Sequence, residues 1–407
     1  MVGLDSAIML RPETWVASGH VDSFSDPLVE DTITHKRYRA DHLIEAWIKA
    51  QPAGTISVDV EDMTVEQMAT FIADNKIQSP DGNPINEPKA FNLLFETAIG
   101  SVSSDKAKIY LRGETAQGIF TNFKNILDST RVKMPFGVGQ MGKSFRNEIT
   151  TGQFVFRTLE FEQAEIEFFF NPNQTEWQPL FKSWQDAMWH FVSKTLKIKE
   201  PNLRWRKHTD TERSFYSLDT YDLEYEFPFG FKELWGIAYR TDYDLNQHIK
   251  LSGQKLQYTD PHTNETFVPH VIEPALGLSR AFLMVMCDAY REDRENNRVV
   301  LEFAPQVAPY QIAIFPLLKN KPELITKALE VRDMLTSSRN NWRVTYDDRG
   351  NIGKRYLSQD EIGTPFCLTV DFDTLEKDTV TIRNRDTTKQ ETIPIAELEQ
   401  YLVNMIG

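Results

Sequence analysis

Polar and apolar side chains alternate clearly near the middle of the chain. From residue 163 to 168, Gln163, Glu165 and Glu167 are polar and the residues between them are apolar. A period of two is typical of a strand whose two faces differ, so one face carries acids and the other meets the core. We predict one strand over 154–170, paired in a hairpin with a second strand over 138–149.

Other stretches show the period of an amphipathic helix. Aromatic residues and Met188 recur at helical spacing over 175–198, which indicates a core helix rather than a ligand site. Thr64 followed by Gln67 is the pattern of a capping box and opens a second helix. Residues 115–127 predict a helix, and 271–290 predicts a strand, a glycine-marked turn and a nearly all-apolar, buried helix.

The pattern divides the chain near Pro305. Residues 1–42 predict short strands and loops, and about 43–95 has the character of an insertion, as does the helical segment at about 175–200. Beyond Pro305 the pattern becomes β-α-β, which predicts a compact α/β domain over 305–407. The larger region before it spans 1–300.

Composition narrows the class of protein. The chain has 407 residues, 41% of them hydrophobic, and only two cysteines, Cys287 and Cys367, which excludes a disulfide framework or a cysteine-rich zinc site. No apolar run approaches the roughly 20 residues that span a bilayer, and "MVGLDSAIMLRPETW" lacks the pattern of a signal peptide. We therefore expect a reduced, cytoplasmic setting and no membrane partner.

The net charge of −14 argues against a surface that binds nucleic acid everywhere. The charge is uneven, however. Residues 305–407 carry 13 Lys+Arg and 15 Asp+Glu, a balance of only −2. The last quarter of the chain is therefore the part least repelled by a polyanion.

The first candidate for chemistry is "GKSFRNEIT". Arg146 and Glu148 lie two positions apart, and on an alternating strand they share a face. With Arg157, Glu165 and Glu167 on the neighbouring strand, they form a floor of interleaved arginines and glutamates. The alternative is a solvated sheet face held by cross-strand ion pairs.

Two further segments bear on this choice. Glu114 stands in "YLRGETAQG" just before a helix, and Glu273 and Arg280 bracket "EPALGLSR" at the start of another. A helix N-terminus with an added arginine is suited to an anion, although a charge there can also be simple exposure at a helix end. Together these segments offer cations for phosphates and carboxylates for a small amine. "DDRGNIGKRY" has no phosphate-loop pattern and is interpreted as a loop.

These motifs together resemble a known family. "FRNEIT" with "FRTLEFEQAEIEFF" resembles motif 2 of the class II aminoacyl-tRNA synthetases, and "EPALGLSR" with its apolar helix resembles motif 3. "YLRGETAQGIFTNF", "ELWGIAYRTDYDL", "WVASGHVDSFSDP" and "DEIGTPFCLTVDFDTLEKDTVTIRNRD" narrow the resemblance to the dimeric glycyl-tRNA synthetases. The resemblance implies an α+β fold: an antiparallel class II catalytic sheet flanked by helices over 1–300, then an α/β anticodon-binding domain over 305–407.

The resemblance also implies an ATP site and a catalytic pair, Arg146 and Arg280. Arg146 is expected at the α-phosphate and the glycine carboxylate, Arg280 at the γ-phosphate end, Glu148 at the adenine amino group, Phe156 against the adenine ring, and Glu233 at magnesium. The full implied set is Arg146, Asn147, Glu148, Phe156, Arg157, Thr158, Leu159, Glu160, Phe161, Glu233, Leu234, Gly277, Leu278, Ser279 and Arg280.

A glycine site follows from the same resemblance. Glu114, Glu165 and Glu273 are expected to receive the ammonium group and Arg39 to lie near the carboxylate. The full implied set is Arg39, Glu114, Phe161, Glu162, Gln163, Ala164, Glu165, Glu273, Pro274, Ala275, Leu276 and Gly277. The implied ligands are ATP with Mg²⁺, glycine and the tRNA for glycine, and a small rigid pocket is expected to exclude the methyl group of alanine sterically.

The sequence departs from the family pattern in three places. It begins at the strand half of motif 1 with Pro12 in the motif's proline position, so we expect the homodimer of the family to be impaired without the preceding helix. Gly113 replaces a proline and loosens the backbone that aims Glu114. Relatives with zinc bind it around 31–40, where this chain has no cysteine, so we expect no zinc.

Two alternatives to a glycine–tRNA ligase stay open at this point. One is a catalytically silent homologue that binds nucleic acid as an accessory subunit, which the retained Arg146, Glu148 and Arg280 disfavour. The other is an adenylate-forming ligase for a different amino acid, which "GETAQG" and the acidic pocket disfavour.

Overall fold

The chain folds into two compact units. The computed structural model describes residues 1–52, 58, 60, 63–100 and 107–406. One unit comprises 1–188 and 203–283, and the other comprises 189–202 and 284–407. Each unit has a hydrophobic core of its own.

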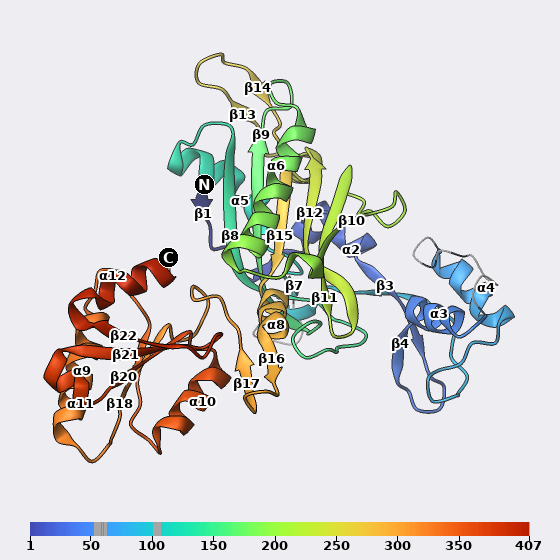
Figure 1. The fold of residues 1–407 in the computed structure, drawn as a ribbon. Helices are drawn as coiled ribbons and strands as arrows, with labels where there is room; N and C mark the ends of the chain where they lie inside the picture. Colours follow the sequence, from blue (N-terminus) through green and yellow to red (C-terminus); the bar gives the residue numbers. More distant parts are fainter. Residues whose placement is uncertain (53–57, 59, 61–62, 101–106, 407) are drawn as a thin grey trace. The chain divides into compact units, whose positions relative to one another are not determined.

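A seven-stranded sheet forms the centre of the first unit (Figure 1). Its neighbouring strands are antiparallel except β1 and β8, which are parallel. In order across the sheet, the strands are β1 (Val2–Gly3), β8 (Phe136–Phe145), β9 (Glu160–Phe170), β15 (His270–Gly277), β12 (Gly230–Thr241), β11 (Asp219–Phe227) and β10 (Leu203–Lys207). This arrangement is the antiparallel-rich sheet that the resemblance implies.

The alternation in β9 is confirmed, with one unexpected feature. Gln163, Glu165 and Glu167 are buried, whereas the apolar residues between them, Ala164 and Ile166, are only partly buried. The acidic face of the strand therefore lies inside the protein. Buried carboxyl groups need donors or cations, so this face is the first place to search for a site.

Helix α5 (Ala116–Thr130) packs on this sheet. Ile119, Phe120 and Phe123 recur at helical spacing and join a core with Phe136 of β8 and Phe169 of β9. Fully burying each such side chain contributes about 1.5–3 kcal/mol of transfer free energy. The packing fixes the start of α5, and with it the preceding Glu114, against the sheet.

The N-terminal segment contains helices where the sequence predicts only short strands and loops. α1 (Pro12–Ala17) begins at Pro12, and α2 (His20–Ser23) follows it. The prediction is wrong here because proline is favoured at the first helical position, where its missing N–H costs nothing. From this segment β2 (Met9–Leu10) joins two later strands, β7 (Ala107–Leu111) and β6 (Glu96–Ile99), in a three-stranded sheet.

The segment predicted as an insertion, about 43–95, shares a small sheet and two helices with the strands that precede it. Thr64 and Gln67 make the capping box that the sequence predicts, at the start of α4. Asp31 is fully buried, and its carboxylate accepts hydrogen bonds from Ser79 Oγ (2.6 Å), Thr34 N (2.8 Å) and other donors. The elements are β3 (Ser25–Glu30), β4 (Arg37–Arg39), β5 (Lys89–Asn92), α3 (Ala40–Lys49) and α4 (Val65–Asp74).

Two apolar helices differ in burial from their prediction. In α6 (Trp177–His190) Phe181 and Met188 are buried as predicted, but Phe191, in a following π-helical turn, is 44% exposed. In α8 (Leu278–Ala289) only Met284 and Ala289 are buried, so the prediction of a fully buried helix is wrong. The other short elements are a π-helix (Phe191–Thr195), a 3₁₀-helix (Glu200–Asn202), α7 (Tyr243–Ser252), β13 (Tyr258–Thr259), β14 (Thr266–Phe267), β16 (Tyr290–Asp293) and β17 (Arg298–Leu301).

The second unit contains a five-stranded sheet in the order β19–β18–β20–β21–β22, parallel over its first three strands and antiparallel over the rest. "DDRGNIGKRY" is not wholly a loop, because α10 begins at Ile352, where the Asn351 side chain accepts from Lys354 N at 2.9 Å. The elements are β18 (Ile312–Pro316), α9 (Pro322–Thr336), β19 (Val344–Tyr346), α10 (Ile352–Ile362), β20 (Phe366–Val370), α11 (Phe372–Lys377), β21 (Thr379–Asn384), β22 (Gln390–Pro394) and α12 (Ile395–Ile406).

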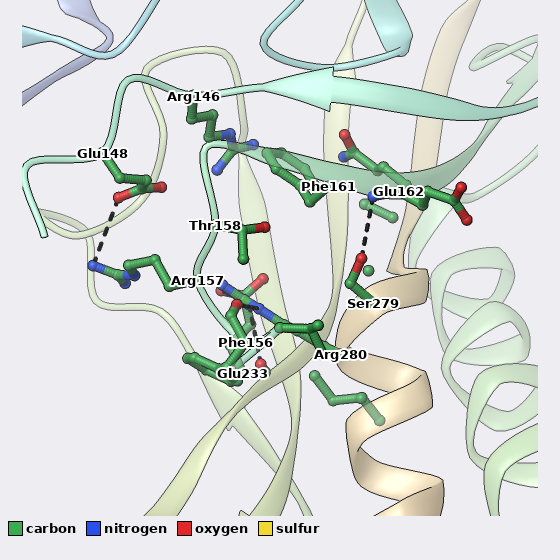
Figure 2. Close-up of a pocket in the computed structure, with 15 residues that line it drawn as sticks. Arg146, Glu148, Phe156, Arg157, Thr158, Phe161, Glu162, Glu233, Ser279 and Arg280 are labelled. Atoms are coloured by element: carbon green, nitrogen blue, oxygen red, sulfur yellow. Dashed lines mark hydrogen bonds and ion pairs between the residues drawn. The ribbon is translucent and has the colours of Figure 1, made fainter. Parts of the chain in front are cut away.

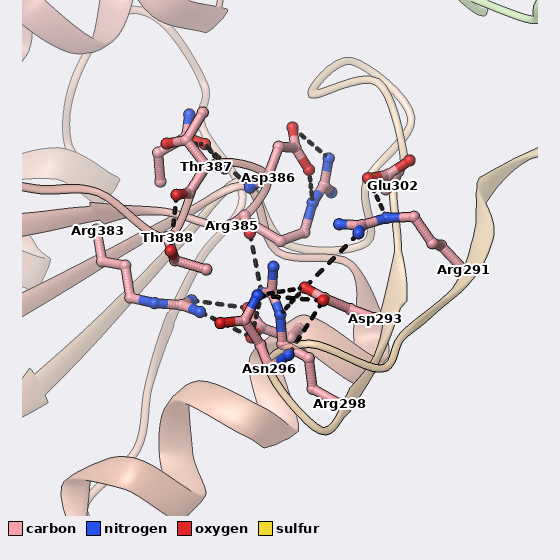
Figure 3. A network of polar contacts seen from close by, with 12 residues as sticks. Arg291, Asp293, Asn296, Arg298, Glu302, Arg383, Arg385, Asp386, Thr387 and Thr388 are labelled. Carbon is pink, nitrogen blue, oxygen red and sulfur yellow. Dashed lines mark hydrogen bonds and ion pairs between the residues drawn. The ribbon is translucent and has the colours of Figure 1, made fainter.

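A buried ion-pair network within this second unit ties the β16–β17 hairpin to α10 and β21 (Figure 3). Asp360 of α10 is completely buried and accepts from Arg298 Nη1 at 2.7 Å and from both Nη atoms of Arg383 at 2.7 and 2.9 Å. Arg385 adds hydrogen bonds to the carbonyl groups of Gly363 and Phe303.

None of the described helices is long and apolar enough to cross a lipid bilayer.

Candidate active site

A pocket lies where β9, β12, β15 and the start of α8 meet the loop that follows β8 (Figure 2). Most of the residues expected to bind ATP contribute to it. The lining residues are Arg146, Glu148, Val155, Phe156, Arg157, Thr158, Phe161, Glu162, Gln163, Glu233, Leu234, Ala275, Gly277, Ser279 and Arg280.

Arg146 and Glu148 lie in a loop rather than on a strand. β8 ends at Phe145 and β9 begins at Glu160, so the predicted strands over 138–149 and 154–170 are too long. The backbone N–H of Arg146 donates to Leu159 O at 3.0 Å, and that of Glu148 donates to Arg146 O at 2.8 Å. The prediction that Arg146 and Glu148 share one face of a strand is therefore wrong. Hydrogen bonds of the loop bring the two side chains to the pocket instead.

The Arg146 side chain is a cation held in place by neutral groups. Its Nε donates to Gly113 O at 3.2 Å, and its guanidinium carbon lies 5.1 Å from the ring centre of Phe24 and 5.4 Å from that of Phe161. Within the described part of the chain, no carboxylate lies at ion-pair distance from it. A cation oriented by rings and a carbonyl is available for an anionic ligand.

Arg280 lies across the pocket from Arg146 and is already paired. Its Nη1 lies 2.9 Å from Glu233 Oε2, and its Nε donates to Phe156 O at 3.2 Å. Its guanidinium carbon lies 4.5 Å from the ring centre of Phe156, which in turn packs edge-on against Phe227 and Phe229. The adjacent Arg280 lowers the pKa of Glu233 to about 2, so this carboxylate is ionised.

Two weaker contacts complete the pocket wall, and both are visible in Figure 2. Glu148 lies 3.9 Å from Arg157 across the loop. The backbone N–H of Glu162 donates to Ser279 Oγ at 3.2 Å, which joins β9 to the start of α8.

The three acids expected at the glycine ammonium lie together in the interior next to this pocket. Each of Glu114, Glu165 and Glu273 is about 95% buried or more. Glu165 pairs with Ala275 of the pocket wall across β9 and β15, and its Oε2 accepts from Thr115 N at 2.7 Å. The buried acids therefore lie directly behind the wall of the pocket that Arg146 and Arg280 line.

Arg240 of β12 holds these acids, and it is not among the residues predicted from the sequence. It is completely buried, and its Nη1 donates to both oxygens of Glu273 at 2.9 and 3.0 Å. Its Nε and Nη2 donate to Asp244 at 2.7 and 2.8 Å, and it lies 3.5 Å from Glu114. The sequence did contain a signal for Arg240: it ends the apolar run "LWGIAYR", and a charged residue in such a run needs buried partners.

The acids differ in their protonation. Burial opposes ionisation of Glu114, but His20, 3.2 Å away, and Arg240 hold its pKa well below the usual range. Burial, followed by the charge of Glu114, raises the pKa of Glu165. Burial raises the pKa of Glu273, and the adjacent Arg240 opposes this shift. The raised pKa values of Glu165 and Glu273 reflect an interior in which the buried acids outnumber the cations that contact them.

Gly113 is closely surrounded. A Cβ atom built there lies 3.2 Å from Leu94 Cδ2 and 3.3 Å from Phe24 Cε1, so any larger residue requires these side chains to move by a few tenths of an ångström. The carbonyl group of Gly113 also accepts from Arg146. The backbone before Glu114 is therefore held from both sides.

Several residues of the predicted sets lie elsewhere. Arg39 pairs with Asp26 (2.6 Å) and Asp41 (2.5 Å) and does not line the pocket. Ala164 and Leu276 pair with each other on the face of the sheet opposite to Glu165 and Ala275. Pro274 of the predicted glycine set is buried in β15 and does not line the pocket. Four members of the predicted ATP set also lie outside the pocket lining: Asn147, Leu159, Glu160 and Leu278.

Comparison with known proteins agrees with this arrangement. The family described as "Anticodon binding domain" matches residues 311–405. The glycine–tRNA ligase of Clostridium acetobutylicum is 49% identical over 411 residues, which cover 100% of this chain and 86% of that protein. A glycine–tRNA ligase of Bacillus cereus is 46% identical, with 100% and 87% covered.

A solved structure shares the fold. The prolyl-tRNA synthetase from Cryptosporidium parvum, in complex with L-proline and AMP, superposes with a TM-score of 0.60 at 18% identity, over 78% of this chain and 62% of that one. The central sheet and the C-terminal domain thus define a class II aminoacyl-tRNA synthetase. The identities are high enough to go one step further: the chain belongs to the glycine–tRNA ligase family. The fold class and the family that the sequence motifs indicate are both confirmed.

Proposed function

We propose that the pocket binds ATP and that the buried acids next to it bind glycine, so that the chain performs the reaction of its family. It is an ATP-dependent ligase that joins glycine to its tRNA. In the proposed site, Arg146 meets the α-phosphate and the glycine carboxylate, Arg280 meets the γ-phosphate end, and Glu114, Glu165 and Glu273 receive the ammonium group.

The observation that carries this proposal is the order of side chains along β9. Phe161 contacts Arg146, Gln163 lines the pocket, and Glu165 belongs to the buried acidic end. A glycine molecule is a carboxylate joined to an ammonium group by one carbon. Its two charges match the cation at one end of this row and the acids at the other.

The chemistry needs no covalent nucleophile. A carboxylate oxygen of glycine attacks the α-phosphorus of ATP and pyrophosphate leaves, which gives glycyl-adenylate. The terminal ribose hydroxyl of tRNA then attacks the activated carbonyl and AMP leaves. The protein contributes in-line positioning and stabilisation of the developing negative charge, and Arg146 is the cation suited to that task because its described contacts are all to neutral groups.

Binding of ATP requires Arg280 to move. A base between the Phe156 ring and the guanidinium needs about 7–8 Å, twice a van der Waals contact, and the two groups lie 4.5 Å apart. We propose that the phosphates take Arg280 from Glu233 when ATP enters, and that the base then stacks on Phe156.

The pocket also fits Mg²⁺, which proteins bind through one or two carboxylates together with substrate phosphates. Glu233 is ionised and its side chain is 48% exposed, so it is the residue that would hold the ion. When bound, Mg²⁺ neutralises phosphate charge.

The partners follow from the same family. We propose that residues 305–407 bind the anticodon end of the tRNA, which the anticodon-binding family match over 311–405 supports. The catalytic domain is proposed to span 1–300. A homodimer and a cytoplasmic location are proposed from the family resemblance, and Cys287 and Cys367 are free thiols as a reducing compartment requires.

Glycine-dependent exchange of pyrophosphate into ATP tests the proposed site. We expect exchange by the wild-type chain, its loss in Arg146→Ala, and no change in the control Arg294→Ala, whose side chain is 88% exposed in the other unit. A folded wild-type chain that binds tRNA but supports no exchange would instead indicate the silent accessory protein.

A further inference from the structure

Glu167 of β9 is a carboxyl group without a neutralising partner in the described part of the chain. Its side chain is completely buried, and neither oxygen has a hydrogen-bond donor among the described residues. Its neighbours differ in this respect, because Glu165 accepts from Thr115 and Glu273 accepts twice from Arg240. A buried carboxylate without a donor is so unfavourable that it takes up a proton instead.

Other acids surround Glu167 closely. Oxygen atoms of Glu165, Glu167 and Glu273 all lie within 4.8 Å of one another. Burial, followed by the charge of Glu273, raises the pKa of Glu167 well above the usual range. On β8 the residue opposite Glu167 is the uncharged Val138. The charged groups that face it from the other elements are Glu273 on β15, Arg240 on β12 and Asp244 on α7, together with Glu165 on its own strand.

Arg240 cannot supply the missing charge. Its guanidinium is already shared among Asp244, Glu273 and Glu114. Tyr216 covers it, with the guanidinium carbon 3.8 Å from the ring centre. The other basic groups described at this end also have partners: His20 pairs with Glu114, His248 with Gln117, and Arg112 with the carbonyl groups of Lys143 and Ser6. A cation that binds at Glu165 and Glu273 would therefore also lie next to Glu167, which has no cationic partner of its own among the described residues.

We propose that Glu167 is a positioning residue for glycine, which carries a proton while the pocket is empty and loses it when the ammonium group enters. Glycine binding then releases one proton to solvent. Only the O–H bond of the Glu167 carboxyl group breaks, and the ammonium group replaces that proton as the positive partner of the acids. The proton belongs on Glu167 because both oxygens of Glu273 accept from Arg240. This inference rests on the proposed glycine pocket.

The direct test is calorimetry of glycine binding at about pH 7, in the presence of a non-hydrolysable ATP analogue, in buffers that differ in ionisation enthalpy. The wild-type chain should release about one proton per glycine. Glu167→Gln, which keeps the shape but cannot ionise, should bind glycine with no proton release. The matched control is Glu226→Gln, an exposed position on β11 of the same sheet, and it should behave as wild type.

Kinetics give a second readout. In pyrophosphate exchange, the wild-type KM for glycine should fall about tenfold between about pH 6 and pH 7, because each binding event must expel one proton. In Glu167→Gln the KM for glycine should show no such change over that range.

The outcomes distinguish the role of Glu167 from the pocket as a whole. Glycine binding by the wild-type chain without proton release overturns the role of Glu167 and leaves the glycine pocket intact, even if Glu167→Gln does not fold. The role is also overturned if Glu167→Gln lowers kcat or stability while its KM for glycine still falls between about pH 6 and pH 7 as in the wild-type chain. Failure of the wild-type chain to bind glycine overturns the pocket itself.

Discussion

Replacing Arg240 by methionine is the most informative single change in the buried part of the site. Methionine retains most of the side-chain volume but removes the guanidinium that donates to Glu273 and Asp244. Removing one partner of a buried ion pair costs about 3–5 kcal/mol, because the remaining charges keep their desolvation penalty. For a unit of this size we expect the melting temperature to fall by about 6–20 °C.

The pH dependence of this loss has a definite sign. Without Arg240, the folded-state pKa of Glu273, already raised by burial, rises further above its unfolded value of about 4.3. A group with a raised folded-state pKa favours the folded state below its unfolded pKa, and this contribution disappears as the pH rises through the folded pKa. The stability deficit of Arg240→Met should therefore be smallest at acid pH and should grow only when the pH rises through the raised folded-state pKa of Glu273.

Thermal and chemical unfolding of both proteins at about pH 5 and about pH 9 measure this deficit. The matched control is Arg204→Met on β10, where a 53% exposed arginine pairs with Glu224; such pairs contribute about 0–1 kcal/mol. An Arg240→Met variant as stable as this control, or one whose deficit is larger at acid pH, would refute the electrostatic account of the pocket.

Three further predictions concern the rest of the molecule. Phe156→Ala should raise the KM for ATP by about tenfold or more in pyrophosphate exchange, because stacking of a base on a ring contributes about 1–3 kcal/mol. Glu233→Gln frees Arg280 from its ion pair and removes the proposed ligand of Mg²⁺, so a titration of exchange rate against Mg²⁺ should shift to higher concentrations. Asp360→Asn removes the carboxylate that pairs with Arg383 and with Nη1 of Arg298, so the second unit should lose about 3 kcal/mol in its unfolding transition, while glycine-dependent exchange stays unchanged.

Local features of the fold could be predicted because they depend on neighbouring residues. The alternation in β9, the capping box at Thr64 and the place of Arg280 in the first turn of α8 all follow from short spacings. Loop chemistry was harder to predict. β8 ends at Phe145 although the next residues continue the strand pattern, and α10 was interpreted as a loop because Gly350 and Gly353 flank its true cap.

The buried part of the site could be predicted only in fragments, because long-range contacts assemble it. Glu114 meets His20 and Arg240 from distant segments, and Gln117 donates to Asp244 across 127 residues of chain. Parity placed Glu165 on a polar face, but it gave no indication that this face is buried. Family resemblance supplied the ligands, since charges alone specify a small amine and not glycine.

The most direct test of the central claim compares glycine, alanine and glycolate as substrates in pyrophosphate exchange by the same preparation. Glycolate has the carboxylate of glycine without the ammonium group, and alanine adds one methyl group. A pocket that pairs Arg146 with one end of the substrate and buried carboxylates with the other predicts exchange with glycine, and rates with the other two that are lower by about 100-fold or more. Comparable exchange with glycolate would show that the acids of β9 and β15 do not recognise the ammonium group, and this result would contradict the account.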